Sequence, residues 1–295
     1  MYYIGIDGGG TKTAFGLFDE EGTCLKRIEY STCHFLQVGF DGCAYVLKMG
    51  VDDFVHQFHI SPKELKIGIG IAGYGNDQNI RKQLEESIQA NLKEYPYSIT
   101  NDMHIAMIGS LNGQDGIAVV AGTGTIAMAQ ANNCIYRCGG WGYQLGDEGS
   151  AYWIGKQLLK EFCKQADNRQ PRGELYDYIM KYFQIDNPYQ MIEHVHNLAN
   201  ERTEIAKLSK ICSELADLGH KKSCYILQSA GVHVSELVKG LYHCFDEDIK
   251  ISYFGGVFQN IIFKESFQSQ IHPHQCIEPI HDALTGAYIY AKMSL

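Results

Sequence analysis

The sequence predicts an α/β protein of two domains, each built on a mixed β-sheet flanked by helices. Its 295 residues are enough to form two hydrophobic cores. A unit of two apolar strands joined by a tip rich in glycine and threonine occurs twice, at residues 3–18 and 116–129. Strands alternate with helical patterns around both units, which is typical of sheets covered by helices.

The first repeated unit has the pattern of a β-hairpin. Its apolar strands flank a tip made of Gly8, Gly9, Gly10, Thr11, Lys12 and Thr13. A strand rather than a helix follows this tip, which excludes a Walker A loop and a dinucleotide fingerprint. Successive turn amides can bind an anion, so the tip indicates phosphate binding, although a hairpin without a ligand has the same pattern.

Asp7 closes the first strand beside this tip. A carboxylate next to bound phosphate repels it unless a cation lies between them. Asp7 therefore predicts a Mg²⁺ site, with the ion held directly or through water.

The charge of the chain limits its partners. The formal net charge is −9, from 34 acidic and 25 basic residues, and no long basic cluster is present. This pattern argues against nucleic-acid binding. An acidic protein that handles phosphate must use backbone amides and a metal.

The chain has neither a signal-peptide pattern nor an apolar run of membrane-spanning length. Its ten cysteines contain no C-x-x-C pair. We therefore expect a cytoplasmic protein with reduced thiols and no membrane contact.

Helical and strand patterns alternate through the rest of the first half. A third short strand is predicted at 23–25, a loop at 31–35, helices at 39–58 and 77–92, and strands at 65–71 and 97–100. A further helix starts at Asn101-Asp102. Asp102 is either a cap of this helix or a catalytic carboxylate.

The second repeated unit carries the tip Gly122, Thr123, Gly124 and Thr125. The second strand of this unit is followed by another short strand, as in the first unit. Two facing hairpins of this kind can clamp a polyphosphate between two domains.

A loop with five glycines and two aromatics follows at 139–149, and it contains Asp147 and Glu148. These acids either bind a ligand or favour the N-terminus of the next helix, which Ser150 should cap. Helical patterns dominate from 174 to 245. A strand at 249–254 then leads to the turn Gly255-Gly256, and a closing helix rich in small residues begins at 282.

This ordered set of motifs resembles the actin/hexokinase/heat-shock ATPase superfamily. Within it, segment 139–153 resembles the N-acetylglucosamine kinase branch, which is grouped with the BadF/BadG/BcrA/BcrD ATPases. The resemblance implies two ribonuclease H-like, actin-like ATPase domains with a central cleft. The domains would span 1–110, with the closing helix 282–295 packed back on it, and 111–281, with a helical insertion at about 151–248.

The implied activity is an ATP-dependent kinase that phosphorylates a hydroxyl of an amino sugar. The sugar would be N-acetylglucosamine or a related cell-wall hexosamine such as N-acetylmuramic acid, and ATP would bind with Mg²⁺. By motif position, Asp102 matches the catalytic base and Thr123 an ATP phosphate contact, while Gly255 and Gly256 border the adenosine. The predicted sugar-binding residues are Gly140, Trp141, Gly142 and Asp147, together with Cys33, His34, Gly73 and Asn101.

The residues suit this chemistry, with one departure from the family pattern. A carboxylate at a helix start can accept the proton of the attacking hydroxyl, and Trp141 can pack against the apolar face of a sugar. Where the family usually carries Asn in its first sugar loop, this chain has Cys33-His34. A thiol cannot replace the hydrogen bonds of an amide, so His34 or Gln37 is the alternative contact.

Two other classes of protein stay open. A BadF-type ATPase activator of a CoA-ester dehydratase or reductase carries a Cys just before the second hairpin, where this chain has Val119-Val120-Ala121. A non-catalytic sugar sensor would not need Asp102. We expect a homodimer that binds ATP and a small sugar.

Overall fold

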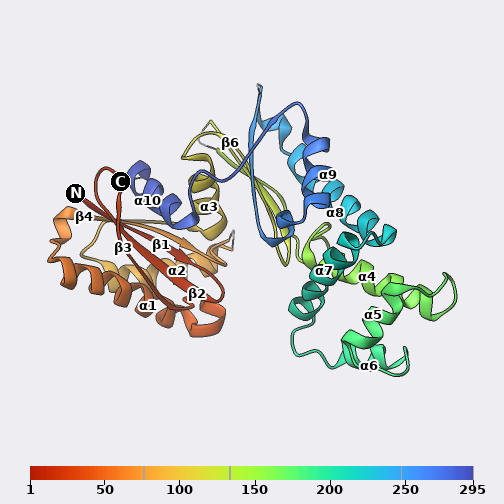
Figure 1. Ribbon diagram of the computed structural model, residues 1–295. Coiled ribbons are helices and arrows are strands. Elements are labelled where there is room, and N and C mark those ends of the chain that lie inside the picture. The colour runs from red at the N-terminus through yellow and green to blue at the C-terminus, as the bar shows by residue number, and fades with distance from the viewer. Residues whose placement is uncertain (76, 133, 247, 295) are drawn as a thin grey trace. The chain divides into compact units, whose positions relative to one another are not determined.

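The computed structural model describes residues 1–75, 77–132, 134–246 and 248–294 (Figure 1). The chain forms two compact units. One contains Met1–Asp115 and the segment that starts at Glu278, and the other is Gly116–Ile277. The predicted domain limits, 1–110 and 111–281, lie close to these borders. Leu295, the last residue of the predicted closing helix, lies outside the described residues.

The first unit is built on a five-stranded mixed sheet with the order β3-β2-β1-β4-β5. β1 pairs antiparallel with β2 and parallel with β4. The strands are β1 (Tyr2–Gly8), β2 (Lys12–Phe18), β3 (Cys24–Ser31), β4 (Leu65–Ile71) and β5 (Tyr97–Asn101). β3 runs well beyond the predicted 23–25. It is an edge strand with one face in solvent, so exposed residues alternate with half-buried ones and the strand contains no continuous apolar run.

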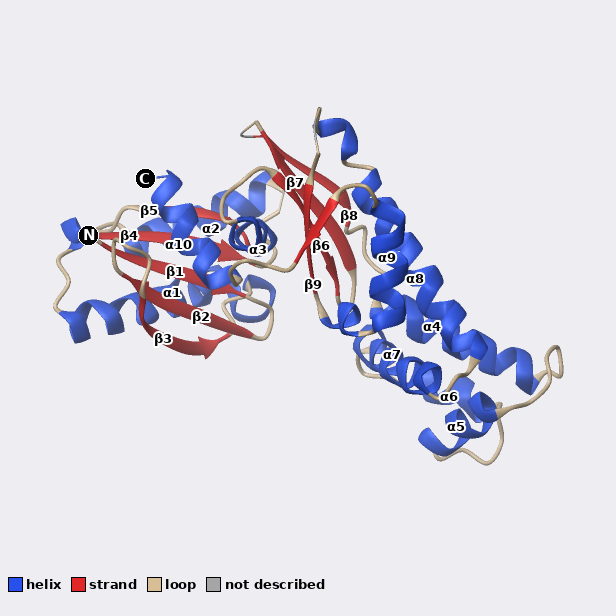
Figure 2. Ribbon diagram, turned by 45° about the horizontal axis from the view of Figure 1, so that its top comes forward, coloured by secondary structure: helices blue, strands red, loops and turns tan. Residues whose placement is uncertain are grey.

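Helices cover both faces of this sheet (Figure 2). On one face, Ile4 and Ile67 of the strands share a buried core with Leu47 and Leu84. These two leucines belong to α1 and α2, and α3 and α10 pack on the opposite face. The helices are α1 (Phe35–Phe58), η1 (Pro62–Glu64), α2 (Gln78–Leu92), α3 (Asp102–Leu111) and α10 (Ala283–Ser294).

The start of α1 differs from the prediction, which placed it at Gly39. The helix begins at Phe35, where the His34 side chain caps it by accepting a hydrogen bond from the amide of Leu36. Gly39 then interrupts the helix with a φ of 74°. The apolar periodicity is continuous only after this break, so the sequence pattern missed the first turn.

Helix α10 returns the end of the chain to the first unit, as Figure 1 shows by its blue colour among red and orange strands. Glycines allow this close packing. A Cβ atom on Gly68 of β4 would lie 2.0 Å from the carbonyl oxygen of Ala287. Likewise, a Cβ on Gly286 of α10 would lie 1.9 Å from the carbonyl oxygen of Ile105 in α3.

We expect Gly286→Ala to destabilise the protein by about 1–3 kcal/mol, because the added methyl group must separate two packed backbones. The loss should exceed the gain in helix propensity that alanine brings, which is about 1 kcal/mol. Thermal unfolding measures it. The control is Gly173→Ala at the N-cap of the helix Glu174–Tyr182, since no atom lies within 4 Å of a Cβ at Gly173. Equal melting temperatures for the two variants would contradict the packing argument.

The second unit repeats the sheet of the first, with the order β10-β9-β6-β7-β8. β6 pairs antiparallel with β7 and parallel with β9, so β6 has the place of β1. The strands are β6 (Gly116–Ala121), β7 (Thr125–Ala131), β8 (Cys134–Gly139), β9 (Lys250–Phe254) and β10 (Gln275–Ile277). The predicted duplication of a strand–tip–strand–strand unit is therefore confirmed.

Between β8 and β9 the chain is mostly helical, as predicted. Ser150 caps α4, accepting a hydrogen bond from the amide of Trp153. Apolar faces of these helices and of β6 form one buried core. The helices are α4 (Ala151–Ala166), α5 (Glu174–Tyr182), α6 (Gln190–His196), α7 (Glu201–Asp217), α8 (Lys221–Lys239) and η2 (Tyr242–Cys244), and the later segment adds η3 (Gly256–Gln259) and α9 (Ile261–Ile271).

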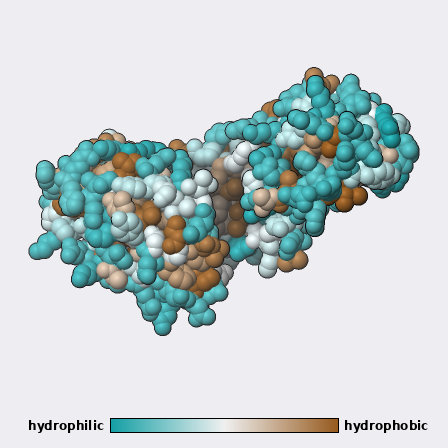
Figure 3. All heavy atoms as spheres, turned by 90° about the horizontal axis from the view of Figure 1, so that it is seen from below, coloured by the Kyte–Doolittle hydropathy of each residue, from teal (hydrophilic) through white to brown (hydrophobic). Residues whose placement is uncertain are grey.

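The surface is largely polar on the face that Figure 3 shows, where apolar side chains form smaller patches among hydrophilic ones. Among the described residues, no helix combines the length and the apolar character needed to cross a lipid bilayer.

Candidate active site

The first glycine-rich tip joins β1 to β2 and is hydrogen-bonded to the segment that follows β3. The amide of Gly9 donates to the carbonyl of Lys12 (3.0 Å). Thr32 Oγ1 donates to the carbonyl of Gly9 (2.8 Å), and Gln37 Nε2 donates to that of Gly10 (2.7 Å). The side chains that follow β3 therefore fix the tip through its carbonyl groups.

Two side chains of this tip have partners on β3. Thr13 is buried, and its Oγ1 donates to the carbonyl of Ser31 (2.9 Å). Lys12 Nζ lies 2.5 Å from Glu29 Oε1 in an exposed ion pair. Such a pair contributes about 0–1 kcal/mol, so Lys12 can exchange Glu29 for a phosphate at little cost, whereas Thr13 is engaged in holding the strand.

Two carboxylates of the first unit have raised pKa values. Asp7 lies near the end of β1, and Asp102 is the first residue of α3. The pKa of Asp7 is raised from 3.8 to about 6, chiefly by burial and then by the charges of Asp102 and Asp282, while Lys12 lowers it. Burial also raises the pKa of Asp102, against hydrogen bonds from backbone amides and the charge of His34.

This charge environment fits a divalent cation. Placing a cation at Asp7 would offset both the burial of its charge and the repulsion from Asp102. No group of three or more His, Cys, Asp or Glu side chains able to hold a metal occurs in the described part of the chain. One or two carboxylates completed by phosphate oxygens and water are a usual Mg²⁺ site, so Asp7 suits Mg²⁺ bound together with a nucleotide.

The predicted sugar residues of the first unit do not all reach its surface. Gly73 has a φ of 84°, and a Cβ there would lie 3.4 Å from His34 Nε2, so these two residues are neighbours. Asn101 is the N-cap of α3, and its Oδ1 accepts from the amide of Met103 (2.8 Å). Cys33, in contrast, is fully buried.

The thiol of Cys33 packs under the first tip, where a Cβ on Gly8 would lie 2.6 Å from Cys33 Sγ. Its burial does not support the prediction that Cys33 contacts a sugar. The sequence pattern alone could not tell that the thiol of this loop points into the core.

The second tip is connected to the loop 139–149 by several hydrogen bonds. The amide of Gly140 donates to the carbonyl of Thr125 (3.0 Å), and Thr125 Oγ1 donates to that of Glu148 (3.2 Å). The amide of Ala151 donates to the carbonyl of Gly122 (2.8 Å). The predicted phosphate tip and the predicted sugar loop therefore form one structural element.

Within this loop the predicted sugar residues differ in exposure. Trp141 is 73% exposed, and the guanidinium of Arg137 lies 5.9 Å from its ring centroid. Gly140 and Gly142 have φ values of 70° and 83°, which favour glycine. Asp147 is only 4% exposed. Its Oδ1 accepts from the amide of Thr125 (3.2 Å) and its Oδ2 lies 3.0 Å from Arg202 Nη2.

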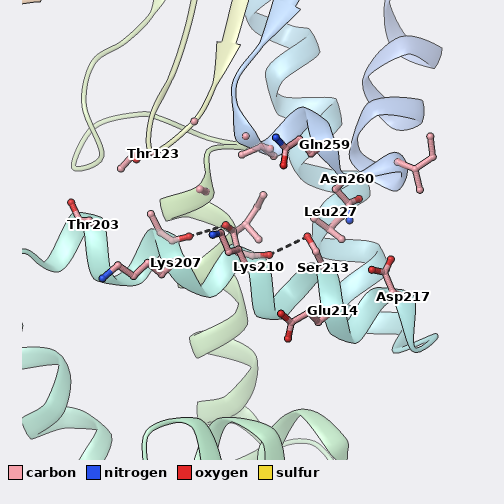
Figure 4. Close-up of a pocket in the computed structure, with 18 residues that line it drawn as sticks. Thr123, Thr203, Lys207, Lys210, Ser213, Glu214, Asp217, Leu227, Gln259 and Asn260 are labelled. Atoms are coloured by element: carbon pink, nitrogen blue, oxygen red, sulfur yellow. Dashed lines mark hydrogen bonds between the residues drawn. The ribbon is translucent and has the colours of Figure 1, made fainter. Parts of the chain in front are cut away.

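The second unit contains a pocket of about 710 Å³ that joins two of the predicted ATP motifs (Figure 4). Gly122 and Thr123 of the second tip line it together with Gly256 of the late turn. Gly255 has a φ of 108°, and a Cβ there would lie 2.3 Å from the carbonyl oxygen of Ala121. A glycine at 255 thus lets the late turn pack directly against the strand that leads into the tip.

One wall of this pocket was not predicted from the sequence. It is a polar stripe of α7, and Figure 4 shows its side chains projecting along one side of that helix. The spacing of three or four residues was a signal, because a polar stripe on an otherwise amphipathic helix can line a site. Its members are Thr203, Lys207, Lys210, Ser213, Glu214 and Asp217.

Comparison with known proteins places the chain in a family. It is 28% identical over 252 residues to the N-acetyl-D-glucosamine kinase of Dictyostelium discoideum, with 81% of this chain and 78% of that protein covered. It is 26% identical over 301 residues to the N-acetylmuramic acid/N-acetylglucosamine kinase of Clostridium acetobutylicum, covering 99% and 98%.

The fold also matches solved structures. A proposed N-acetylglucosamine kinase from Chromobacterium violaceum superimposes with a TM-score of 0.75 over 98% of both chains at 23% identity. This likeness confirms the predicted fold class. The sequence profile of one family spans residues 4–291, nearly the whole chain. The chain therefore belongs to the BadF/BadG/BcrA/BcrD ATPase family.

Proposed function

We propose that this protein is an ATP-dependent, Mg²⁺-requiring kinase that phosphorylates a hydroxyl of an amino sugar, most simply N-acetylglucosamine or N-acetylmuramic acid. The observation that carries the proposal is the convergence of Gly122, Thr123 and Gly256 on one pocket of about 710 Å³. Its volume is within the usual range for small-molecule sites. The names of the two relatives supply the sugar class.

The second unit would hold the nucleotide. The amides of Gly122 and Thr125 donate to Gly124 and Asp147, so the amides of Thr123 and Gly124 are the ones that the tip would offer to phosphate oxygens. Lys207 and Lys210 on the pocket wall add positive charge. Lys207 pairs with Glu204 (2.6 Å) one turn away, an exposed contact that is easily exchanged. Gly256 lines this pocket and leaves room for the adenosine, whereas Gly255 lets the turn pack against Ala121.

The first unit would supply the carboxylate chemistry. Asp7 would hold Mg²⁺ together with the phosphates, and the chemistry that the ion would supply there is neutralisation of charge on the phosphoryl group. Asp102 takes the proton from the sugar hydroxyl as its oxygen forms a bond to the γ-phosphorus and the bond to ADP breaks. The raised pKa of Asp102 makes it a better proton acceptor than an ordinary Asp.

Both units carry proposed sugar contacts. In the first, His34, Gly73 and Asn101 remain candidates, whereas Cys33 acts through its packing under Gly8. In the second, the exposed Trp141 offers an apolar face to the ring, and the residues Gly140, Gly142 and Asp147 shape the loop around it.

We expect ATP consumption that depends on both an amino sugar and Mg²⁺. The test is a panel of N-acetylglucosamine, N-acetylmuramic acid, glucosamine and glucose, with Mg²⁺ or with excess EDTA. N-acetylated sugars should have the highest kcat/KM, and EDTA should abolish turnover. A preference for glucose would reject the amino-sugar assignment.

The same preparation distinguishes the alternatives. An ATPase activator would contain stoichiometric iron and would hydrolyse ATP without a sugar. A sensor would bind sugar without turnover. Either of these outcomes would reject the kinase proposal.

The cellular context is part of the proposal. The ten cysteines are all free thiols, which suits the reducing cytoplasm. The predicted homodimer stays a prediction, and light scattering of the purified protein measures its mass.

A further inference from the structure

An ion pair connects the predicted sugar loop to the wall of the nucleotide pocket. Arg202 lies in the first turn of α7, next to Thr203, which lines that pocket. Its Nη2 lies 3.0 Å from Oδ2 of Asp147 in the loop 139–149. The Asp147 side chain is 3% exposed, so the arginine neutralises a carboxylate that has almost no access to water.

The tip of the second hairpin packs directly on this pair. A Cβ on Gly124 would lie 2.4 Å from Arg202 Nη2 and 2.6 Å from Asp147 Oδ2. The other oxygen of Asp147 accepts a hydrogen bond from the amide of Thr125 (3.2 Å). One carboxylate therefore joins three segments: the loop, the tip that would hold phosphate, and α7.

Aromatic contacts reinforce this junction. The guanidinium of Arg202 lies 5.9 Å from the ring centroid of Tyr143, which belongs to the same loop as Asp147. Tyr143 packs edge-on against Tyr152 of α4, and the Tyr152 hydroxyl donates to Glu201 Oε1 (2.9 Å). Arg202 is thus held from two sides by the loop and by the start of its own helix.

We propose that Arg202 is a positioning residue that couples sugar binding to nucleotide binding. Sugar that orders the loop 139–149 fixes Asp147, and Asp147 in turn fixes Arg202, the start of α7 and the tip at Gly124. Nucleotide then binds to a wall and a tip that are already in place. This inference rests on the proposed kinase function and adds to it a route, inside one unit, between the two substrates.

The strength of the pair supports this role. The Arg202 side chain is 41% exposed, but the Asp147 carboxylate that it neutralises is buried. Removing Arg202 would leave an uncompensated charge on that carboxylate, which costs more than loss of a pair with both partners exposed. Coupling between two sites is reciprocal, so each substrate should tighten the binding of the other, and typical factors are about 5–150-fold. Loss of the Arg202 guanidinium should therefore make both the loop 139–149 and the tip at Gly124 more mobile.

The test compares wild type with Arg202→Met, Arg202→Lys and Arg169→Met. Methionine keeps an apolar stem of similar length without the charge, and lysine restores a point charge. Arg169 is a matched control, because it forms an exposed Arg–Asp pair with Asp167 (2.7 Å) in the same unit. Calorimetry gives the Kd of a non-hydrolysable ATP analogue with and without saturating N-acetylglucosamine, and melting temperatures confirm folding.

In wild type and Arg169→Met, we expect the sugar to tighten analogue binding about tenfold. In Arg202→Met, this factor should fall to about one, and the sugar KM should rise about tenfold or more while kcat changes less. Arg202→Lys should recover part of both effects. A folded Arg202→Met variant that keeps the wild-type coupling factor would overturn the inference.

Failure of the proposed function looks different from failure of this inference. If the proposed function is wrong, wild type itself will not phosphorylate a sugar, and no variant is needed to see this. The role of Arg202 has a readout without any ligand, which is amide exchange of segments 122–126 and 139–149. Arg202→Met should speed exchange in both segments together, and unchanged exchange would count against the positioning role.

Discussion

Replacing Asp102 by asparagine is expected to lower kcat by roughly 10²–10⁴-fold while leaving the fold intact. The amide cannot accept the proton of the sugar hydroxyl, so the general-base contribution disappears. The helix keeps its cap, because Asn101 Oδ1 and Asp102 Oδ1 both accept from the amide of Met103, at 2.8 and 2.9 Å. Asparagine and aspartate cap helices about equally well.

ATP affinity should stay near wild type in this variant, since the nucleotide pocket is lined wholly by residues of the second unit. The pH profile gives an independent check. Protonated Asp102 cannot act as a base, so wild-type kcat should fall on the acid side at a pKa above the usual 3.8, and the variant should lack this limb.

The matched control for Asp102 is Asp77→Asn. Asp77 caps α2 by accepting from the amides of Asn79 and Ile80, so the same chemical change is made at a cap outside the proposed site. Its kcat should equal that of wild type. If Asp102→Asn also keeps kcat within a few-fold, Asp102 is only a helix-terminal residue and the mechanism needs another base.

Replacing Asp7 by asparagine is expected to stabilise the metal-free protein and to inactivate it. In the folded state the pKa of Asp7 rises from 3.8 to about 6, chiefly through burial. Between these values the unfolded chain binds fewer protons than the folded one, so stability falls as pH rises. The penalty is absent below about pH 4 and complete above about pH 6, where it is on the order of 1–3 kcal/mol.

Denaturant unfolding in EDTA at pH 4 and pH 7.5 measures this effect. Asp7→Asn should match wild type at pH 4 and exceed it at pH 7.5. Asp177→Asn, an exposed Asp of α5, is the control and should match wild type at both values. A variant no more stable than wild type at pH 7.5 would show that the buried charge of Asp7 carries no penalty.

The activity of Asp7→Asn tests the metal role separately. Losing the Mg²⁺ ligand should reduce kcat by about 10²–10³-fold, the equivalent of a few kcal/mol of charge stabilisation. Raising the Mg²⁺ concentration should restore part of the rate. A variant with unchanged kcat and unchanged Mg²⁺ dependence would remove Asp7 from the metal site.

The proposed functions differ between the two units: the first supplies the carboxylates, and the second supplies the nucleotide pocket. Asp7 and Asp102 both have raised pKa values, chiefly through burial, and the charge of Asp102 adds to the shift of Asp7. Perturbed carboxylates of this kind are common at functional sites. The second unit carries the amide-rich tip, the lysines of α7 and the ion pair of Arg202. The duplicated sheet has thus been specialised differently in its two copies.

Local patterns were enough to predict several parts of this protein. Glycines and threonines between apolar strands predicted both hairpins, because glycine allows the backbone conformations that tight turns require. The repeat of this pattern predicted a duplicated strand–tip–strand–strand unit, and the structure has it in both sheets. Asn101 and Ser150 were recognised as helix starts, since capping depends on residues within one turn.

Other features depend on contacts between distant segments. The α7 wall of the pocket, the burial of Cys33 under Gly8, and the pairing of Asp147 with Arg202 over 55 residues follow from packing. Gly39 likewise concealed the first turn of α1. By itself, the sequence determined the hairpins, the duplication and the family. The tertiary structure alone decided which side chains point into the core and which line the pocket, because direction and burial are set by neighbours far along the chain.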